Sequence, residues 1–233
     1  IRAPDSDLVW AARGGYGIGR ILSQWDPTPL VERPRLLVGF SDATSLHLTL
    51  AARGVGSVHG PNLTTLANAH DDDVNALFEL LRTPRRHTSV ESLRPLSVAA
   101  QTQSAAVSGP LIGGNLTVLF TEAAAGRLTI PAGALLFLED VTETSYRVDR
   151  MLSALADGGY FERLSGLLLG DFTDCSAGKW NVTVESVLEE RLATLPFPVY
   201  SGLPVGHGAR NRALLHGVTA TLAPSGTLSW GAR

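Results

Sequence analysis

The sequence predicts an α/β protein, and three observations support this prediction. Apolar runs typical of buried strands end in glycine-rich turns, and segments with helical spacing follow several of those turns. The order strand then helix recurs three times in the first half, which favours a parallel sheet covered by helices. The chain of 233 residues is 44% hydrophobic and 18% charged, so it can bury a substantial core.

In the first half we expect three strands, each followed by a helix. The strands are predicted at Leu8–Ala12, Leu36–Val38 and Ser57–His59. The helices are predicted to begin at Ile21, after the turn at residues 39–42, and at Asp71, whose acidic first turn suits a helix N-terminus. Pro27 and Pro29 are expected to end the first of them. These elements predict a Rossmann-like layer, apparently without its first elements.

The second half follows a segment without clear periodicity. Residues 83–108 are rich in Pro, Ser, Thr and Gln, so we expect an N-terminal α/β domain at 1–88, a linker at 89–107 and a smaller C-terminal α/β domain at 108–233. Residues 109–115 are expected to form a glycine-rich turn. The elements expected after it are strands at 134–138, 164–172 and 198–200, helices at 116–124, 146–155 and 182–195, and a closing hairpin at 218–230.

Composition narrows the functional classes. A net charge of −3 gives no electrostatic reason to expect nucleic acid or a membrane surface as a partner. The single cysteine, Cys175, excludes an intrachain disulfide and a cysteine-rich zinc site. No apolar run approaches the ~18 residues of a transmembrane helix, and no signal peptide is visible. We expect a cytoplasmic protein.

The stretch from Arg35 to Leu50 contains the main candidate nucleophile. Ser41 follows an apolar strand and precedes a helical segment, as in the nucleophile elbow of other hydrolases, although Ala43 stands where that motif has its second glycine. The alternative is that Ser41 or Asp42 caps the helix, since both residue types are favoured N-caps.

The glycine-rich loop after the first strand has three interpretations. Gly14, Gly15, Gly17 and Gly19 resemble a phosphate-binding loop only loosely, and no P-loop Lys follows. Such a loop also lets backbone N–H groups approach an oxyanion closely, or it forms a simple tight connection. His59, beside Gly60 and Pro61, is either a site residue or a structural loop histidine.

A carboxylate and a histidine could complete a catalytic set with Ser41. Glu139 and Asp140 follow an apolar strand, where sheet proteins often place site residues, and His207 lies between two glycines on a loop. Serine needs an imidazole to take its proton, and that imidazole needs a carboxylate to orient it. Each of these residues also has a purely structural explanation: Glu139 and Asp140 as solvated charges at a strand end, and His207 as an ordinary loop histidine.

Seven motifs in family order resemble the LD-carboxypeptidase family of serine peptidases. They are Ala12–Gly17, Gly39–Thr44, His59–Pro61, Leu111–Leu116, Leu138–Val141 with Tyr146–Arg150, Gly170–Cys175 and Leu203–Gly208. The resemblance implies a triad of Ser41, Glu139 and His207, and an oxyanion hole made by the backbone N–H groups of Asp42 and Gly15. It offers Gly14, Tyr16, His59, Asn115 and Arg147 as candidate substrate-binding residues.

The resemblance also implies a reaction and a setting. Family members are cytoplasmic, usually homodimeric enzymes that need no metal or organic cofactor. They remove the terminal D-alanine from the murein tetrapeptide during cell-wall recycling. Arg147, Arg210 and Arg212 are candidates to bind the carboxylate of the leaving D-alanine, and the sequence does not choose among them.

Two other functions stay open from the sequence. A microcin-immunity branch of the family cleaves peptidyl- or aminoacyl-nucleotides, and Trp180 could stack on their base. The family pattern also begins upstream of Ile1, and a natural chain without that region could be a binding protein that does not hydrolyse. Because every catalytic motif is intact, we expect instead that the printed chain is a portion of a longer enzyme.

Overall fold

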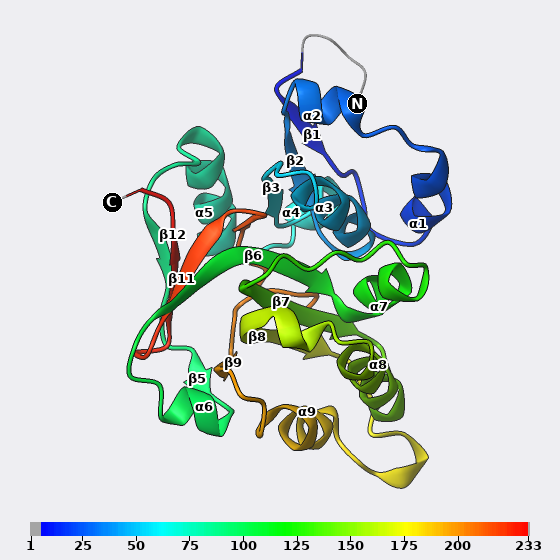
Figure 1. Ribbon diagram of the computed structural model, residues 1–233. Coiled ribbons are helices and arrows are strands. Elements are labelled where there is room, and N and C mark those ends of the chain that lie inside the picture. The colour runs from blue at the N-terminus through cyan, green and yellow to red at the C-terminus, as the bar shows by residue number, and fades with distance from the viewer. Residues whose placement is uncertain (1–5, 233) are drawn as a thin grey trace.

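The computed structural model describes residues 6–232, so the ends of the two predicted domains, residues 1–5 and Arg233, lie outside the described residues. The described chain forms two sheets with helices around them (Figure 1). The smaller sheet has the strand order β1-β2-β3-β10, and the larger one has the order β4-β12-β11-β6-β7-β8-β9-β5. The prediction of an α/β protein is confirmed.

The smaller sheet contains the three strands expected in the first half. β1 (Leu8–Trp10), β2 (Leu36–Gly39) and β3 (Ser57–His59) are parallel, and α3 (Thr44–Ala51) connects the last two. The first predicted helix begins three residues before Ile21, since α1 (Ile18–Ile21) and a 3-10 turn end before Pro27, and a further helix, α2 (Thr28–Glu32), begins directly after that proline. Proline is tolerated in the first turn of a helix because the N–H that it lacks has no partner there.

The larger sheet has a parallel centre. β6 (Val107–Asn115), β7 (Ala134–Val141), β8 (Leu164–Thr173) and β9 (Val199–Ser201) run parallel, and α7 (Leu116–Ala124), α8 (Ser145–Asp157) and α9 (Val184–Leu192) connect them. Alternate residues of one strand enter different cores. Leu136 and Leu138 of β7 pack with the three helices, whereas Leu135 and Phe137 pack toward the smaller sheet.

The segment 89–107, expected to be an aperiodic linker, carries secondary structure. β4 (Thr88–Val90) pairs with β12 (Thr227–Trp230), β5 (Arg94–Pro95) pairs with β9, and α6 (Val98–Gln101) follows. Both strands lie at edges of the larger sheet. Strands of two or three residues are too short for an alternating pattern to be recognised in the sequence. The division of the chain into two domains stays a prediction.

The prediction of a glycine-rich turn at residues 109–115 was wrong, because these residues belong to the nine-residue strand β6. The glycines serve close packing there. A Cβ on Gly113 would lie 1.9 Å from the carbonyl oxygen of Phe137, and one on Gly109 would lie 1.8 Å from that of Gly133. Glycine inside a strand often marks such an approach of another backbone.

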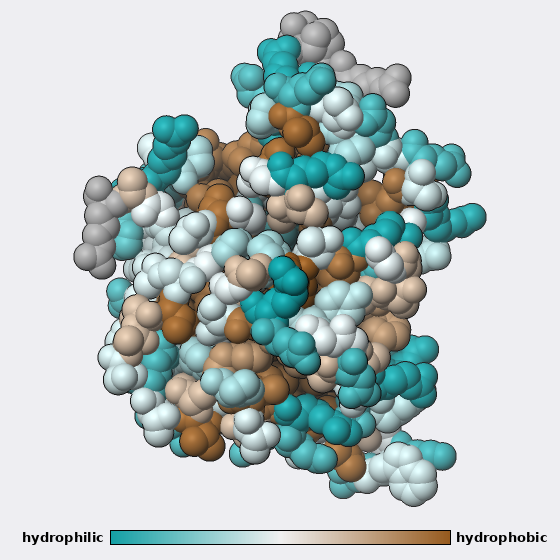
Figure 2. Space-filling model, viewed as in Figure 1, coloured by the Kyte–Doolittle hydropathy of each residue, from teal (hydrophilic) through white to brown (hydrophobic). Residues whose placement is uncertain are grey.

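The remaining elements are two helices and the strands that complete the sheets. They are α4 (Leu63–Leu66), α5 (Asp71–Arg82), β10 (Leu214–His216) and the hairpin strand β11 (Thr219–Ala223) with its partner β12. β10, which the sequence did not predict, returns from the second half and pairs antiparallel with β3. No helix within residues 6–232 is long and apolar enough to cross a membrane. On the face in Figure 2, hydrophobic residues are scattered among hydrophilic ones.

Candidate active site

Ser41 lies on a strained turn directly after β2. Its φ of 64° is a left-handed value that serine rarely adopts, and Ser41–Ala43 forms a 3-10 turn that leads into α3. The turn fits only because residue 39 is glycine: a Cβ there would lie 2.9 Å from the Cβ of Ala11 and 3.0 Å from that of Ala43. No side chain caps this turn or α3, so the capping interpretation of Ser41 is not supported. The geometry is that of a nucleophile elbow.

Three side chains from distant parts of the chain form a hydrogen-bonded series. His207, on the loop between β9 and β10, has Nε2 3.1 Å from Ser41 Oγ and Nδ1 2.7 Å from Glu139 Oε2. Glu139 lies within β7, two residues before the end of the strand. With Nδ1–H donating to the carboxylate, Nε2 is free to accept the proton of the serine hydroxyl. The contacts are those that serine activation requires.

Burial disfavours the charged forms of Glu139 and His207, whereas their contact with each other favours these forms. Burial raises the pKa of the Glu139 carboxyl above its ordinary value, although the hydrogen bond and charge of His207 oppose this shift. Burial lowers the pKa of His207, but the hydrogen bond and negative charge of Glu139 outweigh it, so the pKa is raised overall. Glu139 therefore favours the imidazolium that forms when His207 takes a proton.

Glycines allow the histidine loop to approach β7 and β8. Gly206 has a φ of 134°, and a Cβ on it would lie 3.2 Å from Glu139 Oε2. A Cβ on Gly208 would lie 2.5 Å from Asp171 Oδ2. The two glycines that flank His207 in the sequence thus bring its ring within reach of the carboxylate.

The loop after β1 passes beside the serine. A Cβ on Gly14 would lie 3.0 Å from both Cβ and Oγ of Ser41, and Gly15 has a φ of 129°. Asp42 is partly fixed by its Oδ2, which accepts a hydrogen bond from Ile18 N at 3.0 Å. Gly15, Ser41 and Asp42 line the same cavity. The proposed oxyanion donors therefore lie next to the candidate nucleophile.

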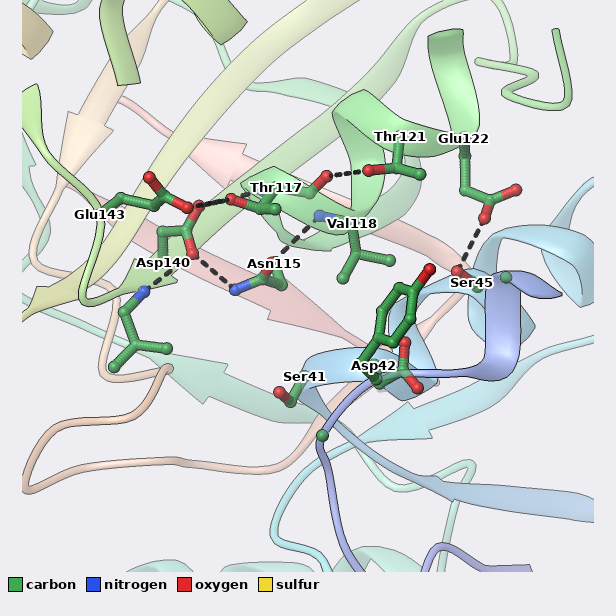
Figure 3. A pocket seen from close by; sticks show the side chains of 14 residues that line it. Ser41, Asp42, Ser45, Asn115, Thr117, Val118, Thr121, Glu122, Asp140 and Glu143 are labelled. Carbon is green, nitrogen blue, oxygen red and sulfur yellow. Dashed lines mark hydrogen bonds between the residues drawn. The ribbon is translucent and has the colours of Figure 1, made fainter. Parts of the chain in front are cut away.

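This cavity has a volume of about 250 Å³ and is rich in carboxylates (Figure 3). Its lining contains no Lys, Arg or His, and its acidic and amide residues are Asp42, Asn115, Glu122, Asp140 and Glu143. Two arginines outside the lining partly compensate this charge: Arg127 pairs with Glu122 at 2.7 Å, and Arg147 pairs with Glu143 at 3.3 Å. The cavity thus suits neutral or cationic groups better than anions.

Asp140 organises one wall of the cavity. It accepts hydrogen bonds from Asn115 Nδ2, Thr117 N, Thr117 Oγ1 and Val141 N at 2.8–3.0 Å. Burial raises the pKa of its carboxyl, and these donors oppose the shift. Asn115 in turn caps α7, because its Oδ1 accepts from Val118 N. The sequence analysis singled out Asn115 and Asp140 of this wall but not Thr117, Glu122 or Glu143.

A second cavity, of about 280 Å³, lies on the histidine side. Phe40, Asn68, His70, His207 and Asn211 are among its lining residues. Ser41 lines the first cavity and His207 lines the second, so each of the two residues in the Ser41–His207 contact borders one cavity.

The structure does not bring every sequence candidate to these cavities. His59 is fully buried, with its ring centroid 5.0 Å from that of Phe137, and it lines neither cavity, which favours its interpretation as a structural histidine. Tyr16 is 85% exposed at the rim of the first cavity. Arg147 reaches Glu143 rather than the cavity itself.

The other candidates also have defined places. Arg210 is bound to Asp73, and Trp180 is 72% exposed with the Lys179 ammonium over its ring, away from both cavities. Burial raises the pKa of Cys175 to about 11, so its thiol is protonated and unreactive at neutral pH. Among the described residues, no group of three His, Cys, Asp or Glu side chains could hold a metal ion.

Comparison with known proteins agrees with this geometry. A family model described as the LD-carboxypeptidase N-terminal domain matches residues 1–60, and one described as the LD-carboxypeptidase C-terminal domain matches residues 108–222. The chain belongs to the LD-carboxypeptidase family. The predicted family resemblance is confirmed, and the protein is a serine-type peptidase of this family.

Individual relatives of this LD-carboxypeptidase family member support the assignment. The murein tetrapeptide carboxypeptidase of Pseudomonas aeruginosa is 37% identical over 225 residues, which are 94% of this chain and 73% of that protein. The solved muramoyltetrapeptide carboxypeptidase of Oxalobacter formigenes is 31% identical with a TM-score of 0.85, covering 100% of this chain and 81% of that one.

A different branch is more distant. The microcin C7 self-immunity protein MccF of Escherichia coli is 25% identical over 235 residues, which are 88% of this chain and 67% of that protein. A structure of MccF in complex with glutamyl sulfamoyl guanosine has a TM-score of 0.82 at 21% identity, covering 99% of this chain and 77% of that one. At that identity the likeness concerns the fold.

Proposed function

We propose that the protein is an LD-carboxypeptidase that removes the terminal D-alanine from the murein tetrapeptide. The observation that carries the proposal is the series Ser41–His207–Glu139, with 3.1 Å and 2.7 Å contacts. The relative of Pseudomonas aeruginosa, named for this activity, supports the choice of substrate. We further propose that the enzyme acts in the cytoplasm, in the recycling of cell-wall peptides, and that it is a homodimer, which light scattering in solution would test.

The reaction follows from the geometry in two halves. His207 Nε2 takes the proton of Ser41 while Oγ attacks the carbonyl that joins the L-centre of diaminopimelate to D-alanine. The backbone N–H groups of Asp42 and Gly15 receive the oxyanion, and each such donor is typically worth about 3 kcal/mol in the transition state. His207 then protonates the leaving amine, and Glu139 keeps its ring oriented. A water molecule then attacks the acyl-enzyme, and His207 again acts first as the base and then as the acid.

The two cavities suggest how the substrate lies. The leaving D-alanine has to be on the His207 side, because His207 donates the proton to its amine, so we assign it to the second cavity. The acyl part then occupies the carboxylate-rich first cavity. The side chain of diaminopimelate ends in an ammonium and a carboxylate, and its ammonium suits a lining that contains four carboxylates and no basic residue.

A second candidate function is hydrolysis of a peptidyl- or aminoacyl-nucleotide, because the microcin self-immunity protein is a relative. Two observations disfavour it. Trp180, the residue offered for stacking on the base, lines neither cavity beside the serine, and the first cavity has an acidic lining. Turnover of the tetrapeptide against turnover of an aminoacyl-sulfamoyl adenylate separates the two candidates.

The deciding experiment is release of free D-alanine from the diaminopimelate tetrapeptide with a metal chelator present. We expect release by the wild type, no effect of the chelator, and a loss of more than about 10⁴-fold in Ser41→Ala. Labelling by a fluorophosphonate probe, in the wild type but not in Ser41→Ala, gives an independent measure of serine activation. A folded wild type that neither labels nor releases D-alanine would make the chain a binding protein.

A further inference from the structure

An ion pair between a buried carboxylate and a partly exposed arginine joins the histidine loop to a helix of the first half. Asp73, in the first turn of α5, has a side chain only 1% exposed. Its carboxylate accepts from Arg210 Nε at 2.9 Å, Arg210 Nη2 at 2.7 Å and the backbone N–H of Asn211 at 3.0 Å. A two-pronged arginine–carboxylate contact fixes direction as well as distance.

This pair lies within a few residues of His207. Asn211 Oδ1 accepts from the backbone N–H of Gly206, the residue before His207, at 3.4 Å. Arg212 N donates to Pro204 O at 2.8 Å, which closes the loop at its base. The Asp73 contacts are therefore transmitted to the backbone on the N-terminal side of the histidine.

The loop is held from two directions. On the side of the larger sheet, Asp171 N of β8 donates to Val205 O at 2.9 Å. On the side of α5, Arg210 and Asn211 bind Asp73. His207 lies between these two anchors, and its ring has to meet Ser41 from one half and Glu139 from the other.

We propose that Asp73 and Arg210 form a clamp that positions His207 against Ser41. The inference rests on the proposed function of His207 as the base, and it makes Asp73 and Arg210 positioning residues rather than catalytic ones. Neither residue lines the two cavities beside the serine. The clamp explains why an arginine near the site is engaged by a buried carboxylate instead of facing substrate.

The test compares Asp73→Asn, Arg210→Lys and the double variant with wild type. Because a displacement of the order of 1 Å at a catalytic group can cost about 10²-fold, we expect kcat/KM to fall by about that factor through kcat, with KM little changed. We expect the rate of fluorophosphonate labelling of Ser41 to fall in parallel. Since the pair acts as one unit, the double variant should be no worse than the more impaired single variant.

A pH profile separates positioning from a merely structural role. A displaced His207 loses part of its contact with Glu139, so the acid limb of kcat/KM should move to lower pH. Loss of folded protein alone would lower the amplitude and leave the limb in place. Asp149→Asn is the control, because it removes another carboxylate–arginine pair, with Arg191, that joins α8 to α9 and not to the histidine loop.

Labelling keeps the inference testable apart from the substrate. If wild-type protein labels at Ser41 but releases no D-alanine, the choice of substrate has failed, and the labelling rates of the variants still test the clamp. If Asp73→Asn does not fold, Arg210→Lys, which keeps the charge and loses the two-pronged contact, carries the test. Labelling and kcat/KM within about threefold of wild type in a folded variant would overturn the clamp.

Discussion

His207 has to be neutral to act as a base, and its neighbours decide the pH at which that holds. Glu139 raises its pKa above the ordinary 6.5, so the neutral form is lost at a higher pH than in a free histidine. We expect kcat/KM to rise with pH through this raised pKa and then to level off. In Glu139→Gln the charge is gone while burial remains. The acid limb should then move to lower pH and the rate should fall by about 10⁴-fold.

The experiment is a pH profile of D-alanine release for the two proteins. The matched control is Asp171→Asn, which alters a carboxyl beside the loop but not in the series. An acid limb that stays in place in Glu139→Gln would mean that another group sets it.

Ser41 leaves little room for any side chain at position 14, which is a glycine. In Gly14→Ala the new methyl group would lie 3.0 Å from Ser41 Oγ, so we expect the hydroxyl to shift and kcat/KM to fall by about 10–100-fold. Stability should change by less than about 1 kcal/mol, because the loop is largely exposed. Gly19→Ala, in the helix α1 that follows this loop, is the control, since the nearest atom to its new methyl group would lie at 3.6 Å. Equal activity of the two variants would contradict the close contact.

At the scale of the element, β6 depends on glycine for its fit against β7. Gly113→Ala should destabilise the protein by more than about 3 kcal/mol, because its Cβ would overlap the Phe137 carbonyl oxygen. Gly17→Ala is a matched control: its φ of 139° is close to the 144° of Gly113, and nothing lies within 4 Å of its Cβ. The control should cost only the backbone strain, about 1–2 kcal/mol. Urea unfolding measures both, and equal losses would show that strain alone matters at Gly113.

The sequence predicted those elements whose signals are local. The apolar runs of β7 and β8 and the acidic start of α5 are visible in any window of the chain. The Gly109–Asn115 stretch was wrongly predicted to be a turn. Its glycines are needed for close packing against a neighbouring strand, and a local sequence pattern carries no information about that neighbour. β10 was missed for the related reason that three residues become a strand only through their partner β3.

The same distinction applies to the site. Ser41, Glu139 and His207 were found because each lies in a marked local context, and their motifs resemble those of a family. That His59 is buried, and that Arg210 is engaged by Asp73, depends on which elements pack together. Burial and ion pairing are properties of the assembled fold, so residue type and spacing could not reveal them.

For the whole molecule, three histidines lie at the junction of the two sheets. His47, His59 and His216 come from α3, β3 and β10, and the ring of His47 lies 5.3 Å from that of His216 and 6.4 Å from that of His59. Burial lowers the pKa of His47 to about 4 and that of His59 to about 3, and it lowers the pKa of His216 well below 6.5. All three are neutral in the folded protein at pH 7.

These lowered pKa values predict a loss of stability in mild acid. Between pH 6.5 and about 4 the unfolded chain binds protons that the folded protein does not, so the free energy of unfolding falls as the pH falls. Each histidine contributes up to about 1.4 kcal/mol per pH unit. The raised pKa values of Asp42, Glu139, Asp140, Asp171 and His207 act in the opposite direction.

His59→Phe tests this without changing the carboxyls. Phenylalanine suits a position between Phe40 and Phe137 and does not titrate. Urea unfolding at several pH values between 4 and 7 should show a shallower loss of stability in the variant, whatever its stability at pH 7. A slope equal to that of wild type would assign the acid sensitivity to other groups.

The return of β10 to the smaller sheet has a consequence for the order in which the protein is made. The sheet that carries Ser41 is complete only when residues 214–216 have paired with β3, yet β3 ends at residue 59. A chain leaving the ribosome therefore exposes this edge until more than 150 further residues have followed. His207 arrives only shortly before β10. The peptidase site is then assembled only after residue 207 has been made, and a shorter nascent chain carries a serine that has not yet been activated.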